Sequence, residues 1–168
     1  MSSVTTAPDE AVIRRATRED VDAIHELVVE LAVATGMQHK VRSTAADFLA
    51  YGFGADPHFH ALVAESNGRI IGLCLYFYEF STWLGSPGLY IQDLVVRRQV
   101  RSAGLGRQLV AETVRLSRLE GATHLRLSVD VNNEGAIRFY QKLGMKSSSD
   151  ERIFHAHGAA FQKLAEIA

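Results

Sequence analysis

Apolar residues recur at helical spacing near the start of the chain, and this spacing predicts a first helix that runs to about Gly36. The recurring positions are Val21, Ile24, Val28 and Leu31. Their separations of three and four residues place them on one helix face. Thr17 is a suitable N-cap, and the acidic residues that follow it favour a helix start. A second, shorter helix is expected from about Ser43 to the sequence YGFG.

The middle of the chain has the alternation and turn signals of a β-sheet. A short strand, AVIRRA, precedes the first helix. FHALVAES and RIIGLCLYFYEF are expected strands joined by Asn67-Gly68, a dipeptide that favours a tight hairpin. GLYIQDLVV is apolar enough for a central strand. LRLSVDV alternates between apolar and polar residues, as a strand with one buried face does.

A helix is expected after each of the last two strands. The first has apolar residues near one face at Leu105, Leu109, Leu116 and Leu119. It ends at Gly121, which is typical of a helix C-terminus. The second begins at a cap, Asn132 or Asn133, and ends at Gly144. Two short strands and a tail helix, GAAFQKLAEIA, complete the chain, and this order of elements predicts an α+β domain on a mixed sheet.

Length and composition indicate one globular domain over residues 1–168, with a frayed start at residues 1–10. Of the 168 residues, 47% are hydrophobic and 22% charged, as is typical of globular domains. The formal net charge of −1 gives no global field that would attract nucleic acid or an anionic membrane. No stretch approaches the roughly 20 apolar residues of a membrane span, and the polar start lacks a secretion-signal pattern. We therefore expect a cytoplasmic protein.

The single cysteine and the seven histidines give no clear indication of redox or metal chemistry. Cys74 lies in the apolar run IIGLCLYFY, where a buried structural thiol is expected. A lone cysteine allows neither an intramolecular disulfide nor a Cys-based metal cage. His58 and His60 share a strand face, as do His155 and His157, but no third ligand at matching spacing accompanies either pair. We expect no metal site.

Four arginines crowd around two glycines in RRQVRSAGLGRQL, residues 97–109. This turn follows an expected strand and opens an expected helix, whose unpaired N–H groups and macrodipole attract anions. Gly104 and Gly106 let those N–H groups approach a ligand without an intervening Cβ atom. The sequence lacks the lysine of a P-loop and the third glycine of a dinucleotide fingerprint. A solvated basic loop is the alternative interpretation of the same residues.

Two motifs in this part of the chain are similar to the signatures of one enzyme family. VVRRQVRSAGLGRQLV resembles the R-x-x-G-x-G/A turn of the Gcn5-related N-acetyltransferases (GNAT family). NNEGAIRFYQKLGM, about 30 residues downstream, resembles the family pattern N-x-x-A-x-x-F-Y-x-x-x-G-F/M. The resemblance covers roughly residues 11–165 and is greatest to the diamine (spermidine/spermine) and thialysine acetyltransferases. It implies an α+β fold in three layers, α/β/α, with a mixed, mostly antiparallel sheet of about six to seven strands, splayed parallel strands in its middle, and about four helices.

The resemblance implies that acetyl-CoA binds where the strands GLYIQDLVV and LRLSVDV splay apart. The pantetheine arm would pair like an added strand with backbone groups of Leu94, Val95 and Val96. Asn133 and Ala136 would contact the cofactor nearby. The pyrophosphate would rest on the turn, whose implied contact residues are Arg101, Ser102, Ala103, Gly104, Leu105 and Gly106.

Acetyl transfer to an amine requires a base, an oxyanion donor and an acid. The substrate ammonium, with a pKa around 10, must first lose a proton. The thioester oxygen needs a donor, for which the resemblance implies a backbone N–H near Val95. Tyr140 occupies the family position of the acid that protonates the leaving thiolate, although its helical spacing also suits a core aromatic. Gln92 stands where the subgroup has a carboxylate and cannot accept a proton, and Asp93 beside it is expected to point to the opposite face. A water chain is the expected substitute.

The same part of the sequence indicates a smaller amine or an amino-acid-like substrate rather than spermidine or spermine. AVATGMQHK, at the end of the first helix, carries no acidic residue, and FSTWLG has no aspartate beside its tryptophan. A polycation would need such carboxylates as partners. The residues expected at the substrate site are Gln92, Asp93, Trp83 and Glu151, with Glu79 as a further acid that could face the amine. For Trp83, a plain hydrophobic plug is the alternative.

We therefore expect an acetyl-CoA-dependent N-acetyltransferase that acts on the primary amine of a small molecule by direct attack on the thioester. The expected acceptor is a diamine, a polyamine-like amine or an amino-acid-like amine. The resemblance also implies a homodimer, and we expect no nucleic-acid or membrane partner. Two alternatives stay open: an acetyltransferase that acts on a peptide or protein amine, and a catalytically silent CoA-binding regulatory module. The second is considered because Gln92 stands where similar enzymes have a carboxylate.

Overall fold

The computed structural model describes residues 11–167, without the side chains of residues 101–103. The chain divides into two compact units, one up to Asn133 and one from Glu134 onward, and each is described by itself. The expected single domain over residues 1–168 stays a prediction. The expected frayed start, residues 1–10, lies outside the described residues.

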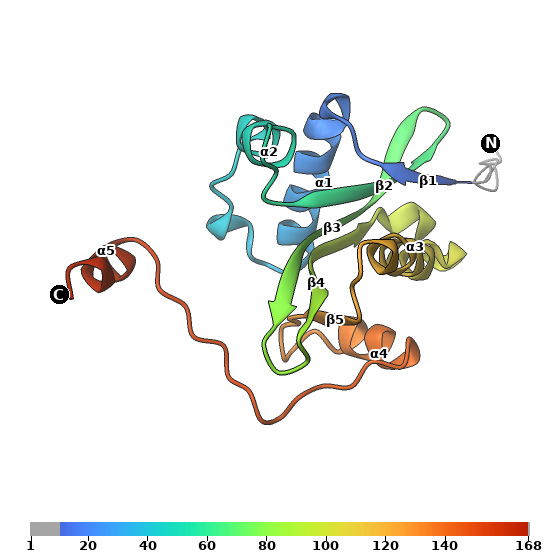
Figure 1. Cartoon of the computed structure of the whole chain (residues 1–168). Helices are drawn as coiled ribbons and strands as arrows, with labels where there is room; N and C mark the ends of the chain where they lie inside the picture. Colours follow the sequence, from blue (N-terminus) through green and yellow to red (C-terminus); the bar gives the residue numbers. More distant parts are fainter. Residues whose placement is uncertain (1–10, 168) are drawn as a thin grey trace. The chain divides into compact units, whose positions relative to one another are not determined.

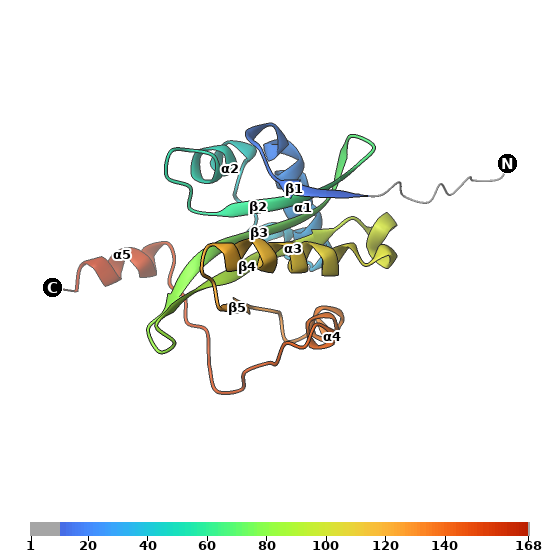
Figure 2. The same cartoon turned by 45° about the vertical axis from the view of Figure 1, so that its right-hand side comes forward.

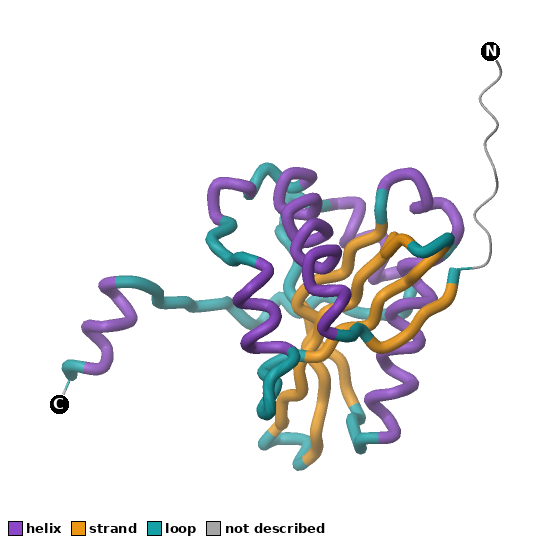
Figure 3. The backbone as a smooth tube through the Cα atoms, turned by 90° about the horizontal axis from the view of Figure 1, so that it is seen from above, coloured by secondary structure: helices purple, strands orange, loops and turns teal. Residues whose placement is uncertain are grey.

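The first unit is built on one sheet of five strands in the order β1-β2-β3-β4-β5 (Figure 1). The strands are β1 (Val12–Arg15), β2 (His60–Ser66), β3 (Arg69–Ser81), β4 (Ser86–Val96) and β5 (His124–Leu127). The pairs β1–β2, β2–β3 and β3–β4 are antiparallel, whereas the pair β4–β5 is parallel. Seen from above, the strands form one twisted sheet (Figure 3).

The hairpin between β2 and β3 turns at Asn67-Gly68, as the sequence predicts. Both residues have positive φ angles, 51° for Asn67 and 70° for Gly68. A two-residue turn of this type needs left-handed backbone at both positions, which asparagine and glycine adopt most easily. This turn places Ser66 of β2 opposite Arg69 of β3, and a bulge between Ala64 and Glu65 then shifts the register by one residue, so that Cys74 lies opposite Leu62.

Helices α1 and α3 cover opposite faces of this sheet (Figure 2). The helices of the first unit are α1 (Val21–Ala34), α2 (Ala45–Gly52) and α3 (Leu105–Leu119), with short 3-10 turns at Arg18–Asp20, Gln38–Lys40 and Arg98–Ala103. Ile24 and Leu27 of α1 are fully buried in one core cluster with Leu73, Leu75 and Val95 of the sheet. We call this side of the sheet the α1 face.

The helix caps use short polar side chains, as the sequence indicates. Thr17 precedes the 3-10 turn that leads into α1, and its N–H donates to the Asp20 carboxylate at 2.8 Å. Thr44 caps α2, with its own N–H donating to Asp47 at 2.7 Å. Such reciprocal contacts satisfy N–H groups that a helix start leaves unpaired.

The buried row of α3 differs from the predicted one. Leu105 and Leu109 are buried as expected, but Leu119 is 75% exposed. Thr113 and Ser117 are fully buried instead, because a row at steps of four residues continues from Leu109 through them. Thr113 is accommodated because its hydroxyl donates to the Leu109 carbonyl oxygen at 2.8 Å.

The sheet has five strands among the described residues, rather than the six to seven expected. The segment 146–157 contains no strand, although two had been predicted there. A strand needs a neighbour for its backbone hydrogen bonds, and this segment forms no ladder. As a result, the parallel pair β4–β5 lies at the edge of the described sheet and not in its middle. The LRLSVDV strand is also shorter than predicted, because β5 ends at Leu127.

The second unit contains two further helices, α4 (Glu134–Lys142) and α5 (Ala159–Ala165). The described chain therefore has five α-helices instead of about four. Helix α4 begins after Asn133, one of the two predicted caps, and Gly144 follows its end with a φ of 86°. A glycine with left-handed backbone after the last turn is a common way to stop a helix.

Candidate active site

Strand β4 carries one residue more than β3 at Gln92. Asp93 lies opposite Leu75 of β3, whereas Ile91 lies opposite the next residue, Tyr76, so that Gln92 has no partner on β3. This arrangement is a β-bulge, which bends a strand and re-aims the side chains beside it. The regular alternation that we assumed between Gln92 and Asp93 therefore does not apply.

The pairing of β4 with β5 ends at the same place. Ile91 and Leu127 are the last paired residues of the two parallel strands. Strand β4 continues to Val96, where its other side is paired with β3. From Gln92 to Val96, the second edge of β4 has no neighbouring strand among the described residues.

Leu94 directs its backbone groups to this open edge. The N–H of Arg97 donates to the Ile71 carbonyl oxygen of β3 at 2.9 Å, and residues of an antiparallel strand alternate in the side to which their N–H and C=O point. Val95 therefore faces β3, and its carbonyl oxygen would lie 3.4 Å from a Cβ atom on Gly72. An extended ligand at the open edge would meet the N–H and C=O of Leu94, as an added strand does.

The arginine-glycine turn connects the end of this edge to α3. Residues Arg98–Ala103 form the 3-10 turn, and Gly104 then adopts a left-handed backbone with φ 71° before α3 begins at Leu105. Gly104 at the N-cap position has no side chain with which to cap α3, so the first N–H groups of this helix are suited to an anion. Gly104 is exposed and Gly106 half-buried. The side chains of Arg101, Ser102 and Ala103 lie outside the described residues.

One of the four arginines of this turn has a structural role. Arg97, only 17% exposed, is in ionic contact with Glu26 and Glu30 of α1, and its Nε donates to the Ile70 carbonyl oxygen at 3.0 Å. These contacts tie α1 to the end of β4. Arg97 is therefore not available to an anion at the glycines, whereas Arg98 and Arg107 of the same turn are exposed.

Asp93 lies on the α1 face, half-buried beside the bulge. Its partner Leu75 and its neighbour Val95 both belong to the core cluster on that face. Burial raises the pKa of its carboxyl above the ordinary value. No hydrogen bond or ion pair from another described residue compensates its charge. A carboxyl in this state is a better proton acceptor near neutral pH than an exposed aspartate.

The other predicted site residues are spread over both units. Trp83 is 97% exposed in the turn between β3 and β4. Asn133 ends the first unit, and its N–H donates to the Asp130 carbonyl oxygen at 2.8 Å. Ala136 and Tyr140 are half-buried on α4 of the second unit, and the exposed Glu151 follows in the same unit. Their roles stay predictions.

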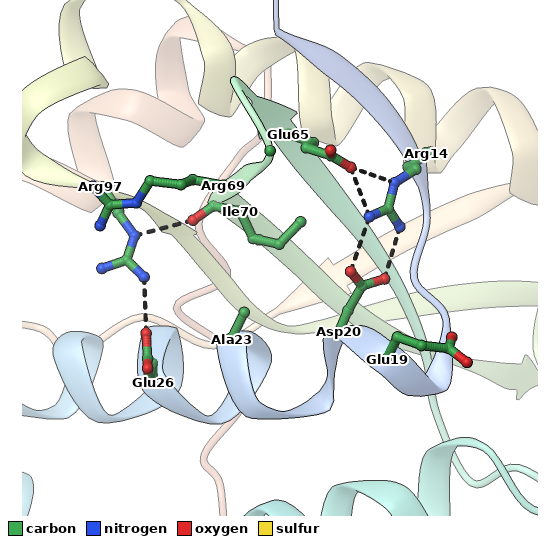
Figure 4. A pocket seen from close by; sticks show the side chains of 10 residues that line it. Arg14, Glu19, Asp20, Ala23, Glu26, Glu65, Arg69, Ile70 and Arg97 are labelled. Atoms are coloured by element: carbon green, nitrogen blue, oxygen red, sulfur yellow. Dashed lines mark hydrogen bonds and ion pairs between the residues drawn. The ribbon is translucent and has the colours of Figure 1, made fainter.

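A cavity of about 320 Å³ between α1 and the β2–β3 hairpin is lined by charges that compensate one another (Figure 4). Arg14 contacts both the Asp20 carboxylate and the Glu65 carboxylate at 2.7 Å. The Arg14 hydrogen bonds are the largest of the causes that lower the pKa of Asp20. A second cavity of about 330 Å³ lies between α1 and the end of β4, and Val95 and Arg98 are among its lining residues.

Cys74 and the histidines show no feature of a reactive centre. Cys74 is fully buried, and burial raises the pKa of its thiol to about 12, so the reactive thiolate is scarce. Within residues 11–167 no three histidine, cysteine, aspartate or glutamate side chains are grouped to hold a metal ion. None of the helices in the described part is long and apolar enough to cross a membrane.

The open strand edge, the bulge and the glycine turn lie along one strand and the start of the next helix, and such features are suited to an extended, phosphate-bearing ligand. The family model described as "Acetyltransferase (GNAT) family" matches residues 17–145. Thialysine N-epsilon-acetyltransferase of Mus musculus is 31% identical over 91% of this chain and 96% of its own length. Aminoalkylphosphonate N-acetyltransferase of Salmonella typhimurium is 32% identical over 81% of this chain and 85% of its own.

Solved structures agree with the fold. An integron cassette protein from V. cholerae superposes with a TM-score of 0.77 at 20% identity, over 93% of this chain and 98% of its own. The chain belongs to the GNAT acetyltransferase family. It is an N-acetyltransferase, and acetyl-CoA is the acetyl donor that this family uses.

Proposed function

We propose that this enzyme acetylates the primary amine of a small molecule, either a diamine, a polyamine-like amine or an amino-acid-like amine, beside the β4 bulge. The proposal rests mainly on Asp93, whose desolvated carboxyl lies next to the open edge of β4. The relatives at about 30% identity are consistent with this range of acceptors, since their names specify thialysine and aminoalkylphosphonates.

In this proposal the acetyl-CoA arm lies along the open edge of β4. The Leu94 carbonyl oxygen and the backbone of Val96, which faces the same open edge, pair with the extended pantetheine amides, next to Val95 on the same strand. The pyrophosphate then meets the N–H groups from Arg101 to Gly106, and Asn133 and Ala136 contact the cofactor near its pantetheine end. The glycine at the N-cap of α3 supports this placement, because Gly104 has no side chain to bond the first N–H groups and these groups attract an anion.

The chemistry needs two protons removed from the acceptor nitrogen, one before and one after the attack, and one proton delivered to the leaving group. Asp93, directly or through one water, accepts a proton from the substrate ammonium. The neutral amine attacks the thioester carbonyl carbon, and the Leu94 N–H donates to the developing oxyanion. The C–S bond then breaks, and the CoA thiolate takes a proton from Tyr140. The acylated nitrogen loses its second proton, which restores the Tyr140 phenol through water, and the proton on Asp93 passes to solvent. The products are the N-acetyl amine and CoA.

Gln92 has a different part in this proposal from the carboxylate of similar enzymes. As the extra residue of the bulge, it is exposed at the point where β4 and β5 separate. Its amide can hydrogen-bond the acceptor but cannot carry the proton. Trp83 and Glu151 are proposed as outer contacts of the acceptor, and the protein is proposed to act as a homodimer.

The test is a panel of primary amines with acetyl-CoA, in which free thiol is measured above the hydrolysis background and the N-acetyl product is identified by mass spectrometry. The expected result is one thiol released for each acetylated amine. Thermal stabilisation by acetyl-CoA without thiol release from any amine would instead identify a CoA-binding regulatory module. Acetylation of peptides but of no free amine would favour the other alternative, which is a peptide or protein acetyltransferase.

A further inference from the structure

The hydroxyl of Tyr90 on β4 bridges to β5 at the point where these two parallel strands separate. Ile91 and Leu127 are the last paired residues of the two strands, and Ser128 follows Leu127 directly. The Tyr90 hydroxyl donates to the Ser128 hydroxyl oxygen at 2.7 Å. In the strand register Tyr90 lies opposite Arg126. Its side chain therefore leans two residues along β5, about 6.6 Å, toward the open edge of β4.

The ring of Tyr90 is held on the α1 face from two sides. Tyr90 lies opposite Phe77 of β3, which is two residues after Leu75, a member of the core cluster on this face. Because side chains alternate between the faces of a strand, both rings point to the α1 face. They are stacked with centroids 5.1 Å apart and an angle of 18° between their planes. Phe77 on one side and Ser128 on the other therefore fix the position of the ring.

The α1 face is closed a second time two residues before Tyr90. Glu79 of β3 and His124 of β5 meet over Gly88 of β4, with 3.4 Å between Glu79 Oε1 and His124 Nε2. Both atoms are enclosed by the protein. A Cβ atom on Gly88 would lie 2.1 Å from His124 Nε2, so glycine is needed for the imidazole to pack here. A group that enters from the open edge of β4 therefore meets Tyr90 first and, behind it, the packed Glu79 and His124.

The proposed cofactor placement directs the acyl group to this bridge. The pyrophosphate lies at the turn after β4, and the pantetheine arm runs back along the open edge past Val96 and the Leu94 carbonyl oxygen. The thioester therefore lies toward Ile91, where β5 begins to occupy the second edge of β4. The Leu94 N–H donates to the thioester oxygen in this placement. The acyl chain, which leaves the carbonyl carbon on the side away from the sulfur, then extends toward Tyr90 and Ser128.

We propose that the hydrogen-bonded pair of Tyr90 and Ser128 forms the end wall of the acyl site and restricts the transferred group to acetyl. The inference rests on the cofactor placement in the proposed function and adds the residues that select the acyl donor. The methyl group of acetyl fits in front of the Tyr90 ring. Each further methylene group of propionyl or butyryl must displace this ring from Phe77 and Ser128, and overfilling a site with fixed side chains is unfavourable.

The transfer itself is the same with a longer donor. The acceptor nitrogen forms its bond to the acyl carbonyl carbon, the C–S bond breaks, and CoA leaves with a proton. Propionyl-CoA would thus give the N-propionyl amine and CoA, and selection concerns only the fit of the acyl chain. Such an end wall is expected to lower kcat/KM about 10- to 100-fold for propionyl-CoA relative to acetyl-CoA, and further for butyryl-CoA.

The experiment compares acetyl-CoA, propionyl-CoA and butyryl-CoA with the best amine of the panel, by thiol release and mass spectrometry of the product. Tyr90→Leu removes both the ring and the hydroxyl. In this variant the ratio of kcat/KM for propionyl-CoA to that for acetyl-CoA should rise about 10-fold or more. A ratio of two donors on one variant does not depend on the fraction of folded protein.

Two smaller changes test the hydrogen bond itself. Tyr90→Phe and Ser128→Ala each remove the bond and keep the rest of the wall, so each should raise the propionyl-to-acetyl ratio by a smaller factor than Tyr90→Leu. The double variant should show the same rise as either single variant, because both substitutions remove one bond. Additive rises would contradict the coupling of the two side chains.

Tyr78→Leu is the matched control on the opposite face of the sheet. Tyr78 is half-buried on β3, next in the chain to Phe77, and its ring contacts His60 and Tyr76 away from the bridge. The ratio of propionyl-CoA to acetyl-CoA should stay as in the wild type. A rise like that of Tyr90→Leu would contradict the proposal.

The proposal is wrong if the wild-type enzyme uses propionyl-CoA as well as acetyl-CoA, or if Tyr90→Leu lowers both donors by one factor. If no amine releases thiol from acetyl-CoA, the proposed function fails, and calorimetry with the same acyl-CoA compounds decides on the end wall. Acetyl-CoA must then bind more tightly than propionyl-CoA, and Tyr90→Leu must reduce the difference. Equal affinities of the wild type for the two compounds would then overturn the proposal.

Discussion

Asp93→Asn separates the catalytic role proposed for this carboxyl from its effect on stability. The carboxylate is half-buried on the α1 face, and burial raises its pKa. A group whose pKa is higher in the folded than in the unfolded chain destabilises the fold when it ionises, by about 1.4 kcal/mol per unit of difference. Asparagine has a similar shape and does not ionise. The variant should therefore be more stable than the wild type at neutral pH and much less active.

The raised pKa of Asp93 determines in which direction the stability difference between the wild type and Asp93→Asn changes with pH. Between the unfolded pKa of about 3.9 and the raised folded value, the folded wild type binds more protons than the unfolded chain. The stability of the wild type therefore falls relative to that of Asp93→Asn as pH rises through this window, and the difference is constant above it. Activity should fall by about 10²- to 10⁴-fold, the usual contribution of a positioned base.

Urea denaturation over a pH series measures the first effect, and thiol release with the best amine of the panel measures the second. Asp47→Asn is the matched control, because hydrogen bonds from the Thr44 backbone N–H and hydroxyl lower the pKa of that exposed carboxyl. The stability of the wild type relative to Asp47→Asn should rise with pH, opposite to the change for Asp93→Asn, and the activity of Asp47→Asn should match the wild type. Undiminished activity in Asp93→Asn would refute the assignment of the base. The desolvation argument would be refuted if Asp93→Asn is less stable than the wild type and the difference in unfolding free energy between them does not change above pH 4.

Three further predictions concern the acid, the turn and the first helix. Tyr140→Phe should lower kcat about 10²- to 10⁴-fold, while calorimetry finds an unchanged affinity for acetyl-CoA; full turnover would remove Tyr140 from the mechanism. Arg97→Met should reduce the free energy of unfolding by about 1–3 kcal/mol through its lost contacts with Ile70 and α1, and a weaker acetyl-CoA affinity instead would mean that Arg97 binds phosphate. The pKa of Asp20 is lowered chiefly by the Arg14 hydrogen bonds, so the stability it contributes is present above about pH 4 and is lost as pH falls through the folded pKa. Asp20→Asn should therefore lose stability at pH 7 and approach the wild type in acid, and an equal loss at both pH values would contradict this.

The local elements were predictable because their signals lie within a few residues. Asn67-Gly68 gives the hairpin, and Thr17 marks the first helix start, since each acts on its own backbone. The second helix was expected from about Ser43, one residue before its observed cap Thr44. The glycine turn before α3 follows in the same way from Gly104, whose φ of 71° suits glycine best. Local chemistry of this kind does not depend on which strands meet in space.

The bulge at Gln92 could not be predicted from the sequence. Alternation within GLYIQDLVV gives no sign of an extra residue, because the mismatch exists only relative to the register of β3. The placement of Asp93 on the α1 face can therefore be derived only once the pairing of β3 with β4 is known. The Glu79–His124 contact is equally non-local, since it joins β3 to β5 across Gly88.

The predicted strands after α4 failed for a related reason. ERIFHAH alternates as a strand does, but Phe154 is 90% exposed and the segment pairs with no strand. Alternation indicates that a segment can form a strand, and only a neighbouring edge makes it one.

Amide hydrogen exchange with and without acetyl-CoA tests most directly the central claim, that the open edge of β4 and the glycine turn hold the cofactor. The account predicts that acetyl-CoA slows exchange at the Leu94 N–H and at the N–H groups around Gly104–Gly106. The Val95 N–H, which already faces β3, should change much less. Tight binding of acetyl-CoA with unchanged exchange at Leu94 and in this turn would contradict the account.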